Sequence, residues 1–236
     1  MPTLPTRPEP RRPPRVAVVS KPGGGRRALV RLDPRDAERY ARAVADVTSR
    51  IERVLRSGVL ANRSLLGPRG AMRLRPWRPA RRGWERAIAR IASGEVAAVV
   101  RADVVDCYGS MGEREIRLIL GANAAPALDV LGPLWDMGVR GLPIGPEASA
   151  VVANAVLAAV DDAVAWAGGA PLRWVDDWVI PVRERRAAGR VLLALEHSLG
   201  ELGLELHLGK TEVLLGRQAI ALGLAGHTRS GLPRMP

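Results

Sequence analysis

Two adjacent aspartates, Asp176 and Asp177, stand between short apolar runs in Arg-Trp-Val-Asp-Asp-Trp-Val-Ile, residues 173–180. Apolar flanks favour burial, and two neighbouring carboxylates that lose their water without a counter-ion repel each other strongly. A tight turn between two strands would place both carboxylates at one edge of a sheet, where a divalent cation could neutralise them. Because aspartate is also common in exposed hairpin turns, a solvent-facing turn stays equally open on this stretch alone.

A third aspartate follows another predicted strand. Residues 96–102 form a largely apolar run with the length and composition of a buried strand, and Asp103 comes directly after it. Two strands that each end in aspartate suit a site for two metal ions, which activate an attacking oxygen and stabilise a leaving one. Carboxylate oxygens favour Mg²⁺, with Mn²⁺ as the alternative, and no cluster of cysteine and histidine indicates zinc.

Helical and strand-like periods together predict an α+β fold, in which helices pack on an antiparallel sheet. Asp33 and Pro34 suit a helix start, and the helical period that follows ends at Gly58. Residues 60–83 are interpreted as a basic connector broken by proline and glycine. A hairpin is expected from strands at 15–20 and 28–32, and further helices at 84–93, 113–120, 148–166 and 184–202.

The motifs resemble those of reverse transcriptases, the RNA-directed DNA polymerases. Asp-Val-Val-Asp-Cys-Tyr at 103–108 is similar to the first palm motif of that family, and Trp-Val-Asp-Asp at 174–177 to its aromatic-x-Asp-Asp motif. Three more segments are similar to family motifs and follow the family's order: the basic fingers hairpin, the segment that opens a long helix under the nascent base pair, and Gly-Leu-x-Leu-x-x-x-Lys-Thr-Glu. They lie at residues 21–29, 141–157 and 203–212.

The resemblance implies a right-hand polymerase fold with fingers and palm and with the thumb absent or vestigial. It divides the chain into a disordered basic arm (1–14), a fingers-like basic region (15–95), a palm catalytic region (96–220) and a short C-terminal tail (221–236). Ala221–Gly226 would be a primer-gripping turn. The implied partners are an RNA template, a DNA primer or product, and dNTPs. A partner protein or a second copy of the chain would then supply the clamp on the duplex.

The resemblance also assigns catalytic roles. Asp103, Asp176 and Asp177 would hold two Mg²⁺ ions, and a 3′-hydroxyl would attack the α-phosphate of a dNTP. Lys210 would be the general acid that protonates the leaving pyrophosphate, because a lysine can give up a proton whereas arginine stays charged. A surface lysine beside a helix is an equally plain interpretation of Lys210.

Nucleotide contacts are implied for four residues: Lys21, Arg27, Tyr108 and Ser149. The two cations would bind the triphosphate, the aromatic ring would exclude a 2′-hydroxyl, and Ser149, with Asn154, would offer polar contacts. Plainer roles are a solvated basic turn for the cations and core packing for the ring. Ile144 stands where the family usually has glutamine, and this resembles prokaryotic defence-associated and abortive-infection-like members, which implies a role in phage defence.

Positive charge is concentrated early in the chain. Residues 1–100 hold 23 Lys and Arg against 8 Asp and Glu, whereas residues 101–236 hold 13 against 16. A basic region beside an acid-bearing one suits a nucleic-acid groove that leads to a metal site. The predicted contacts to nucleic acid are Trp77, Arg78, Arg81 and Arg82. A solvated basic face and a tryptophan in the core are the alternatives.

Two other functions stay open, because the same carboxylates serve several chemistries. One is RNA-synthesising or template-independent nucleotidyl transfer; the other is a thumbless nucleic-acid-binding or regulatory subunit related to polymerases. The single cysteine, Cys107, excludes an internal disulfide framework and fits a reducing cytoplasm. No signal peptide or membrane-spanning segment is expected.

Overall fold

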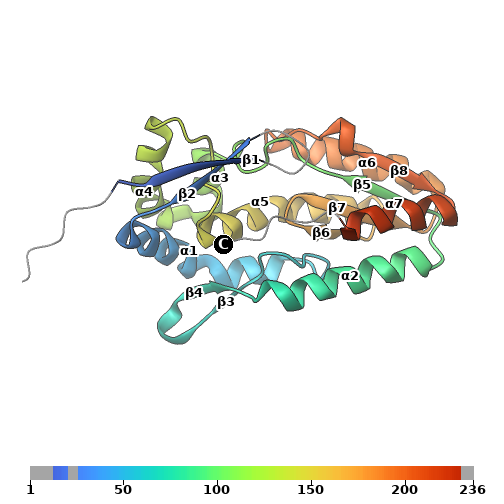
Figure 1. The fold of residues 1–236 in the computed structure, drawn as a ribbon, viewed down its shortest axis with the longest axis horizontal. Helices are drawn as coiled ribbons and strands as arrows, with labels where there is room; N and C mark the ends of the chain where they lie inside the picture. The colour runs from blue at the N-terminus through green and yellow to red at the C-terminus, as the bar shows by residue number, and fades with distance from the viewer. Residues whose placement is uncertain (1–12, 21–25, 230–236) are drawn as a thin grey trace, which may run out of the picture.

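A four-stranded antiparallel sheet lies at the centre of the computed structural model, which describes residues 13–20 and 26–229 (Figure 1). The strand order is β6-β7-β5-β8. The strands span Leu172–Trp174 (β6), Asp177–Val182 (β7), Ala98–Ala102 (β5) and Glu212–Leu215 (β8). Helices pack on this sheet, which confirms the predicted α+β class. The predicted strand before Asp103 and the predicted turn at Asp176 are both present.

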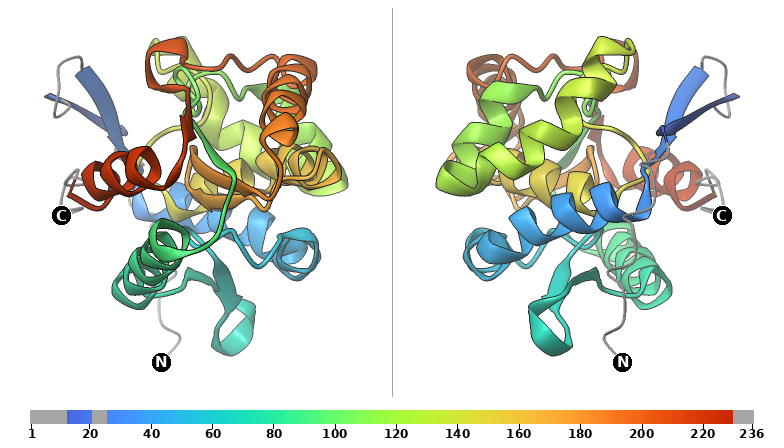
Figure 2. Two further views of the ribbon diagram at one scale, coloured as in Figure 1. Left: turned by 90° about the vertical axis from the view of Figure 1, so that its right-hand side faces the viewer. Right: turned by 90° about the vertical axis from the view of Figure 1, so that its left-hand side faces the viewer.

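Successive side chains of β5 enter two different hydrophobic cores. Val100 belongs to the larger core, with α5 and α6, whereas Val99 belongs to the smaller core, with α2 and α7. Ile180 and Val179 repeat this alternation on β7, as the two-residue period of a strand requires. The helices span Glu147–Trp166 (α5), Arg185–Glu201 (α6), Trp77–Ser93 (α2) and Arg217–Arg229 (α7). Figure 2 shows the sheet between these two helix layers.

The larger core also receives α1, which packs against α4 and α5. Asp33 caps α1 as predicted, because its Oδ1 accepts a hydrogen bond from the Arg35 amide at 3.0 Å. The helix ends at Val54, where Leu55 becomes extended, and does not continue to Gly58. The bounds are Pro34–Val54 (α1), Glu113–Leu120 (α3) and Ala124–Asp136 (α4).

α5 is the central helix of the larger core. It begins one residue before the predicted Ala148 and ends at the predicted Trp166. Its length and apolar composition would suffice to cross a membrane, but 72% of its apolar window is buried inside the molecule, so packing accounts for that composition. The stretch 113–136 is also long and apolar enough, and a 3-10 turn at Gly121–Asn123 divides it into α3 and α4. The sequence pattern does not predict α4, because Pro133 interrupts its helical period.

The β1–β2 hairpin joins the body of the molecule along β2. β1 (Arg15–Ser20) and β2 (Arg26–Arg31) pair antiparallel, so the predicted hairpin is confirmed, with β2 beginning two residues earlier than expected. The Val30 amide donates to the Ile144 carbonyl at 2.7 Å. The hairpin tip and nearly all of the predicted arm at 1–14 lie outside the described residues.

The interpretation of residues 60–83 as a connector is wrong. They contain a short antiparallel pair, β3 (Ser64–Leu66) and β4 (Met72–Leu74), and the first turns of α2. α2 begins at Trp77, seven residues before the expected start. Pro79 does not interrupt it, because the amides of the first helical turn have no partner within the helix.

The turn expected at Ala221–Gly226 is also wrong, because these residues continue α7. Ile220 and Leu224, one helical turn apart, are buried in the smaller core. A methyl group on Gly223 would stand 2.6 Å from Cδ1 of Leu214. Glycine at this position therefore allows α7 to approach β8 closely and does not reverse the chain.

Candidate active site

Three aspartates meet where β5 ends and β7 begins. Asp103 follows the last residue of β5, and Asp177 is the first residue of β7. Since Ala102 lies opposite Trp178, the next step of the antiparallel register brings Asp103 opposite Asp177. Asp176 lies in the two-residue turn that joins β6 to β7. The sheet therefore gathers the three carboxylates at one end of its central strands.

The carboxylates of Asp176 and Asp177 resist ionisation. Burial raises the pKa of Asp176 to about 6, and the negative charge of Asp103 adds to the rise. Burial likewise raises the pKa of Asp177 to about 7, with further contributions from the charges of Asp176 and Asp103. Negative charge in this cluster thus exceeds what the surrounding protein compensates, which is the electrostatic setting that a bound cation would relieve.

Lys210 supplies one positive charge to the cluster, through a hydrogen bond from its ammonium to Oδ2 of Asp103. This hydrogen bond raises the pKa of Lys210, so the ammonium stays charged. Lys210 ends a 3-10 turn that begins at Leu208. The chain before this turn is tied to the end of β5, because the His207 amide donates to the Asp103 carbonyl at 2.8 Å. The predicted general acid therefore contacts one of the predicted metal ligands.

Arg27 approaches the cluster from β2, where its positive charge opposes the rise in the pKa of Asp176. Its Nε atom is buried and has no hydrogen-bond partner among the described residues. Buried donors normally have acceptors, and phosphate oxygens suit a guanidinium well. The predicted contact of Arg27 to a triphosphate stays a prediction. Lys21, the predicted companion of Arg27, lies outside the described residues.

Tyr108 lies close enough to Asp176 for that charge to act on its phenol. Burial is the main cause that raises the phenol pKa, so the ring stays neutral. The Leu142 amide donates to the Tyr108 carbonyl at 2.8 Å. Gly141 has a φ of 57°, and a methyl group there would stand 2.3 Å from the same carbonyl oxygen, so this approach requires glycine. Burial also raises the pKa of the neighbouring Cys107, which therefore remains a thiol.

Ser149 and Asn154 are buried on α5 and make contacts within the protein. The Ser149 hydroxyl donates to the Tyr40 hydroxyl at 3.4 Å. The Asn154 amide donates to the carbonyls of Ala61 and Asn62, each at 3.0 Å. The structure therefore gives both residues protein partners, and the predicted nucleotide contact of Ser149 stays a prediction.

Arg173 and Asp161 are buried charged residues that the sequence motifs do not single out. The Arg173 guanidinium donates from Nη2 to Oδ2 of Asp161 at 2.7 Å and from Nε to both carboxylate oxygens at 3.0 Å. A usable signal exists in the sequence, because an arginine within a strand-like apolar run needs a buried counter-charge, and Asp161 lies within the apolar stretch of α5.

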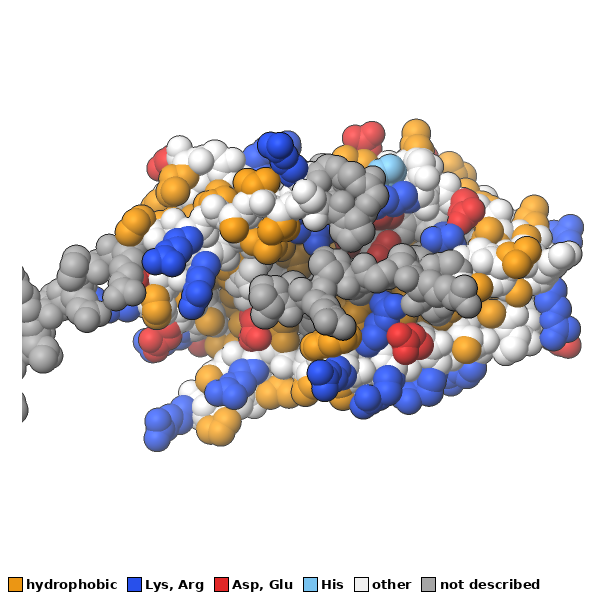
Figure 3. All heavy atoms as spheres, viewed as in Figure 1, with side chains coloured by type: hydrophobic (Ala, Val, Ile, Leu, Met, Phe, Trp, Pro, Cys, Tyr) orange, Lys and Arg blue, Asp and Glu red, His pale blue; other side chains and the backbone are white. Residues whose placement is uncertain are grey.

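The predicted nucleic-acid contacts occupy the first turns of α2 but differ in their surroundings. Arg78 and Arg82 are exposed, and Trp77 is 62% exposed. Arg81 instead pairs with Glu85 at 2.9 Å and places its guanidinium 5.6 Å from the ring centre of Trp174. The exposed arginines recur every four residues along one helix face, which we call the α2 stripe: Arg78, Arg82, Arg86 and Arg90. Figure 3 shows positive side chains gathered along this edge of the molecule.

The donor set fits a divalent cation in its chemistry, because it offers carboxylate oxygens and carries excess negative charge. Asp103, Asp176 and Asp177 are the residues that could hold such an ion. Within residues 13–20 and 26–229, however, no group of three or more His, Cys, Asp or Glu side chains already has the geometry of a metal site. The Lys210 ammonium already donates a hydrogen bond to Oδ2 of Asp103, one of the oxygens that a cation would use.

No protein-family model matches the sequence, and no curated protein is similar to it at a significant level.

Proposed function

We propose that this protein is a metal-dependent nucleotidyltransferase with a polymerase palm, and that its reaction is RNA-directed DNA synthesis. One observation carries the proposal: three carboxylates from strands far apart in the sequence meet at one end of an antiparallel sheet, and burial and mutual repulsion raise the pKa of two of them. The resemblance of the motifs to those of reverse transcriptases selects this chemistry among the reactions that such a cluster supports.

In the proposed reaction, the 3′-hydroxyl of a primer loses its proton to solvent, and its oxygen forms a bond to the α-phosphorus of a dNTP. The bond from that phosphorus to the oxygen bridging it to the β-phosphate breaks, and pyrophosphate leaves. Divalent cations on Asp103, Asp176 and Asp177 would activate the attacking oxygen and neutralise the leaving group. Arg27 would bind the triphosphate through its buried Nε donor. Lys210 would give its proton to the leaving pyrophosphate oxygen.

Template and primer would lie against the α2 stripe. Its four exposed arginines form no ion pair among the described residues, unlike Arg81. One face of a helix with positive charges at four-residue intervals can neutralise successive phosphates of a strand. α2 also packs against Trp174, two residues before Asp176, so the helix that carries the stripe lies near the turn of the carboxylate cluster.

The test is primer extension on an RNA template with Mg²⁺. We expect Asp103→Asn, and separately Asp176→Asn with Asp177→Asn, to abolish extension without unfolding the protein, because asparagine keeps the shape but removes the charge. Asp136→Asn, at an exposed acid of α4, is the control and should extend primers like the wild type. Equal extension by the wild type and the carboxylate variants would exclude the proposed site.

A second candidate is a nucleic-acid-binding subunit without catalysis. Two observations favour it: Lys210 already neutralises Asp103, and the described residues contain no ready-made metal site. Thermal unfolding with Mn²⁺ separates the two functions. Mn²⁺ should raise the Tm of the wild type but not of the variant with all three aspartates changed to asparagine, and an equal rise in both would favour the binding subunit.

A further inference from the structure

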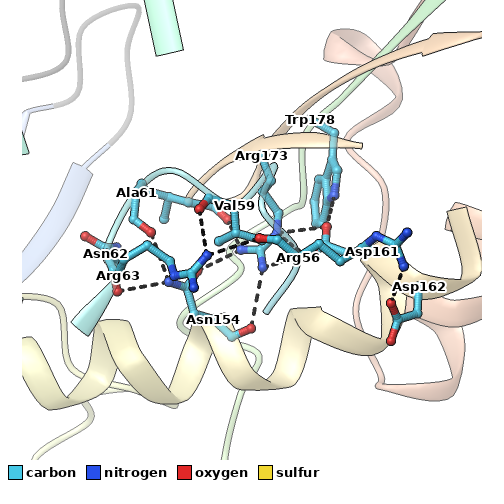
Figure 4. Close-up of polar contacts among 11 residues, drawn as sticks. Arg56, Val59, Ala61, Asn62, Arg63, Asn154, Asp161, Asp162, Arg173 and Trp178 are labelled. Carbon is cyan, nitrogen blue, oxygen red and sulfur yellow. Dashed lines mark hydrogen bonds and ion pairs between the residues drawn. The ribbon is translucent and has the colours of Figure 1, made fainter. Parts of the chain in front are cut away.

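Arg173 is a fully buried arginine in the strand that leads into the turn of Asp176. Its guanidinium bonds to Asp161 and Asn154 on α5 (Figure 4) and to the backbone of the turn. Besides Asp161, Nη1 donates to Oδ1 of Asn154 at 2.8 Å and to the Val175 carbonyl at 2.8 Å. All three guanidinium nitrogens are therefore used, one of them to hold the backbone immediately before Asp176.

The backbone that Arg173 holds is strained. Val175 has a φ of 61°, in the left-handed region that β-branched residues rarely adopt. Strained residues of this kind persist only where their surroundings fix them. The hydrogen bond from Nη1 to the Val175 carbonyl is a direct restraint on this conformation. The direction in which the next two carboxylates point depends on the same turn.

The partners of Arg173 are anchored to one rigid element. Asn154 and Asp161 lie seven residues apart on α5, so two helical turns separate them on the same face. The indole Nε1 of Trp178 donates to Oδ1 of Asp161 at 2.8 Å. Trp178 is opposite Arg173 in the β6–β7 pair and follows Asp177 directly. The network therefore connects α5 to both sides of the turn that carries the two aspartates.

We propose that Arg173 is a positioning residue: with Asp161 and Asn154 it fixes the turn at Val175 so that Asp176 and Asp177 face Asp103. This inference rests on the proposed function, because positioning matters through the reaction of those carboxylates. Net stabilisation is a weak explanation for the pair, since apolar residues of similar volume often stabilise a core at least as well as a buried ion pair. An arginine fork instead supplies several directed bonds from one side chain.

The test uses a double variant, Arg173→Met with Asp161→Asn. This variant removes the positive charge of Arg173 and the negative charge of Asp161 together, so the core keeps no unpaired charge. The side-chain amide oxygen introduced by Asp161→Asn can still accept the hydrogen bond from the Trp178 indole. Arg173→Met alone leaves the Asp161 carboxylate buried without its counter-charge, and we expect its Tm to be well below that of the double variant. The double variant should fold but lack the bond to the Val175 carbonyl.

Three measurements on the double variant test whether Arg173 positions the turn at Val175. In the double variant, hydrogen exchange of the amides at 174–178 should be faster while that of β5 stays as in the wild type. The Tm rise caused by Mn²⁺ should shrink, and kcat for primer extension should fall by about 10²-fold with KM for dNTP little changed. If the double variant has a higher Tm than the single variant and also shows wild-type exchange, Mn²⁺ response and kcat, Arg173 is merely structural.

The matched control is Arg63→Met with Glu52→Gln. This is another charged pair with little exposure, joined at 2.8 Å. Its other contacts run to residues 52–64 and to Arg75, and not to the turn. It should leave exchange at 174–178 and the Mn²⁺ response unaltered. If the wild type itself neither extends primers nor responds to Mn²⁺, the proposed function fails. Hydrogen exchange at 174–178 still tests whether Arg173 positions the turn. Exchange that is unchanged there in the double variant would overturn the positioning role.

Discussion

Asp177 combines a half-buried carboxyl group with two negatively charged neighbours, and burial together with these charges raises its pKa to about 7. An unfolded chain gives aspartate a pKa of about 4. Between these values the folded protein binds more protons than the unfolded chain, so the contribution of Asp177 to stability is present below pH 4 and is lost as the pH rises through 7. Asp176, with its pKa raised to about 6, acts in the same direction.

We therefore predict that the free energy of unfolding of the metal-free protein falls between pH 4.5 and 7.5. One proton of difference corresponds to a slope of at most about 1.4 kcal/mol per pH unit, and solvent at this half-buried site reduces it. Asp177→Asn should flatten the profile. Urea unfolding in the presence of a chelator measures both proteins, and parallel profiles would contradict the raised pKa.

Tyr108 is the residue expected to separate deoxyribonucleotides from ribonucleotides. Its backbone carbonyl accepts a hydrogen bond from the Leu142 amide, and its phenol lies close enough to Asp176 for that charge to act on it. Tyr108→Ala should raise the kcat/KM ratio of rNTP to dNTP, because the clash with a 2′-hydroxyl disappears. Tyr108→Phe keeps the ring and should leave the ratio unchanged. If alanine leaves the ratio as it is, Tyr108 is a packing residue and the RNA-synthesising alternative gains weight.

At the scale of elements, α2 has one face in the smaller core and one face in solvent. Trp84 and Ile88 are buried at a spacing of four residues, and the α2 stripe repeats at the same spacing on the exposed face. Apolar side chains therefore pack on the face of α2 that is turned toward the sheet, and charged side chains cover the face that is turned toward solvent. Arg81 belongs to neither set, because it covers Trp174 and pairs with Glu85.

We predict that the stripe dominates the salt dependence of binding to an RNA–DNA hybrid. Changing Arg78, Arg82 and Arg86 to alanine should reduce the slope of log affinity against log salt by about two to three, since each lost phosphate contact accounts for about 0.9. The control changes three exposed arginines near the start of α6, on the other face of the sheet: Arg183, Arg185 and Arg190. Fluorescence anisotropy measures both, and equal slopes for the two variants would assign the effect to net charge alone.

At the scale of the whole molecule, the parts that local pattern determines were predictable. β5, the turn at Asp176 and the cap at Asp33 depend on neighbouring residues, and all three are present. The network around Arg173 was not predictable in the same way, because its partner Asp161 lies on another element and only the folded chain brings the two charges together. Proline and glycine misled the prediction for different reasons: Pro79 lies in the first turn of α2, where a missing amide is tolerated, whereas Gly223 lies where α7 packs closely on β8.

The strand order β6-β7-β5-β8 has a consequence for how the chain is made. Translation delivers Asp103 first, then Asp176 and Asp177, and Lys210 last of all. If β5 pairs with β7 before β8 joins the sheet, the three acids come together before Lys210 reaches Asp103. The divalent cation proposed for this site would meet no competition from Lys210 at that stage. Pairing between such distant segments is also slow, because long loops must close before the strands meet.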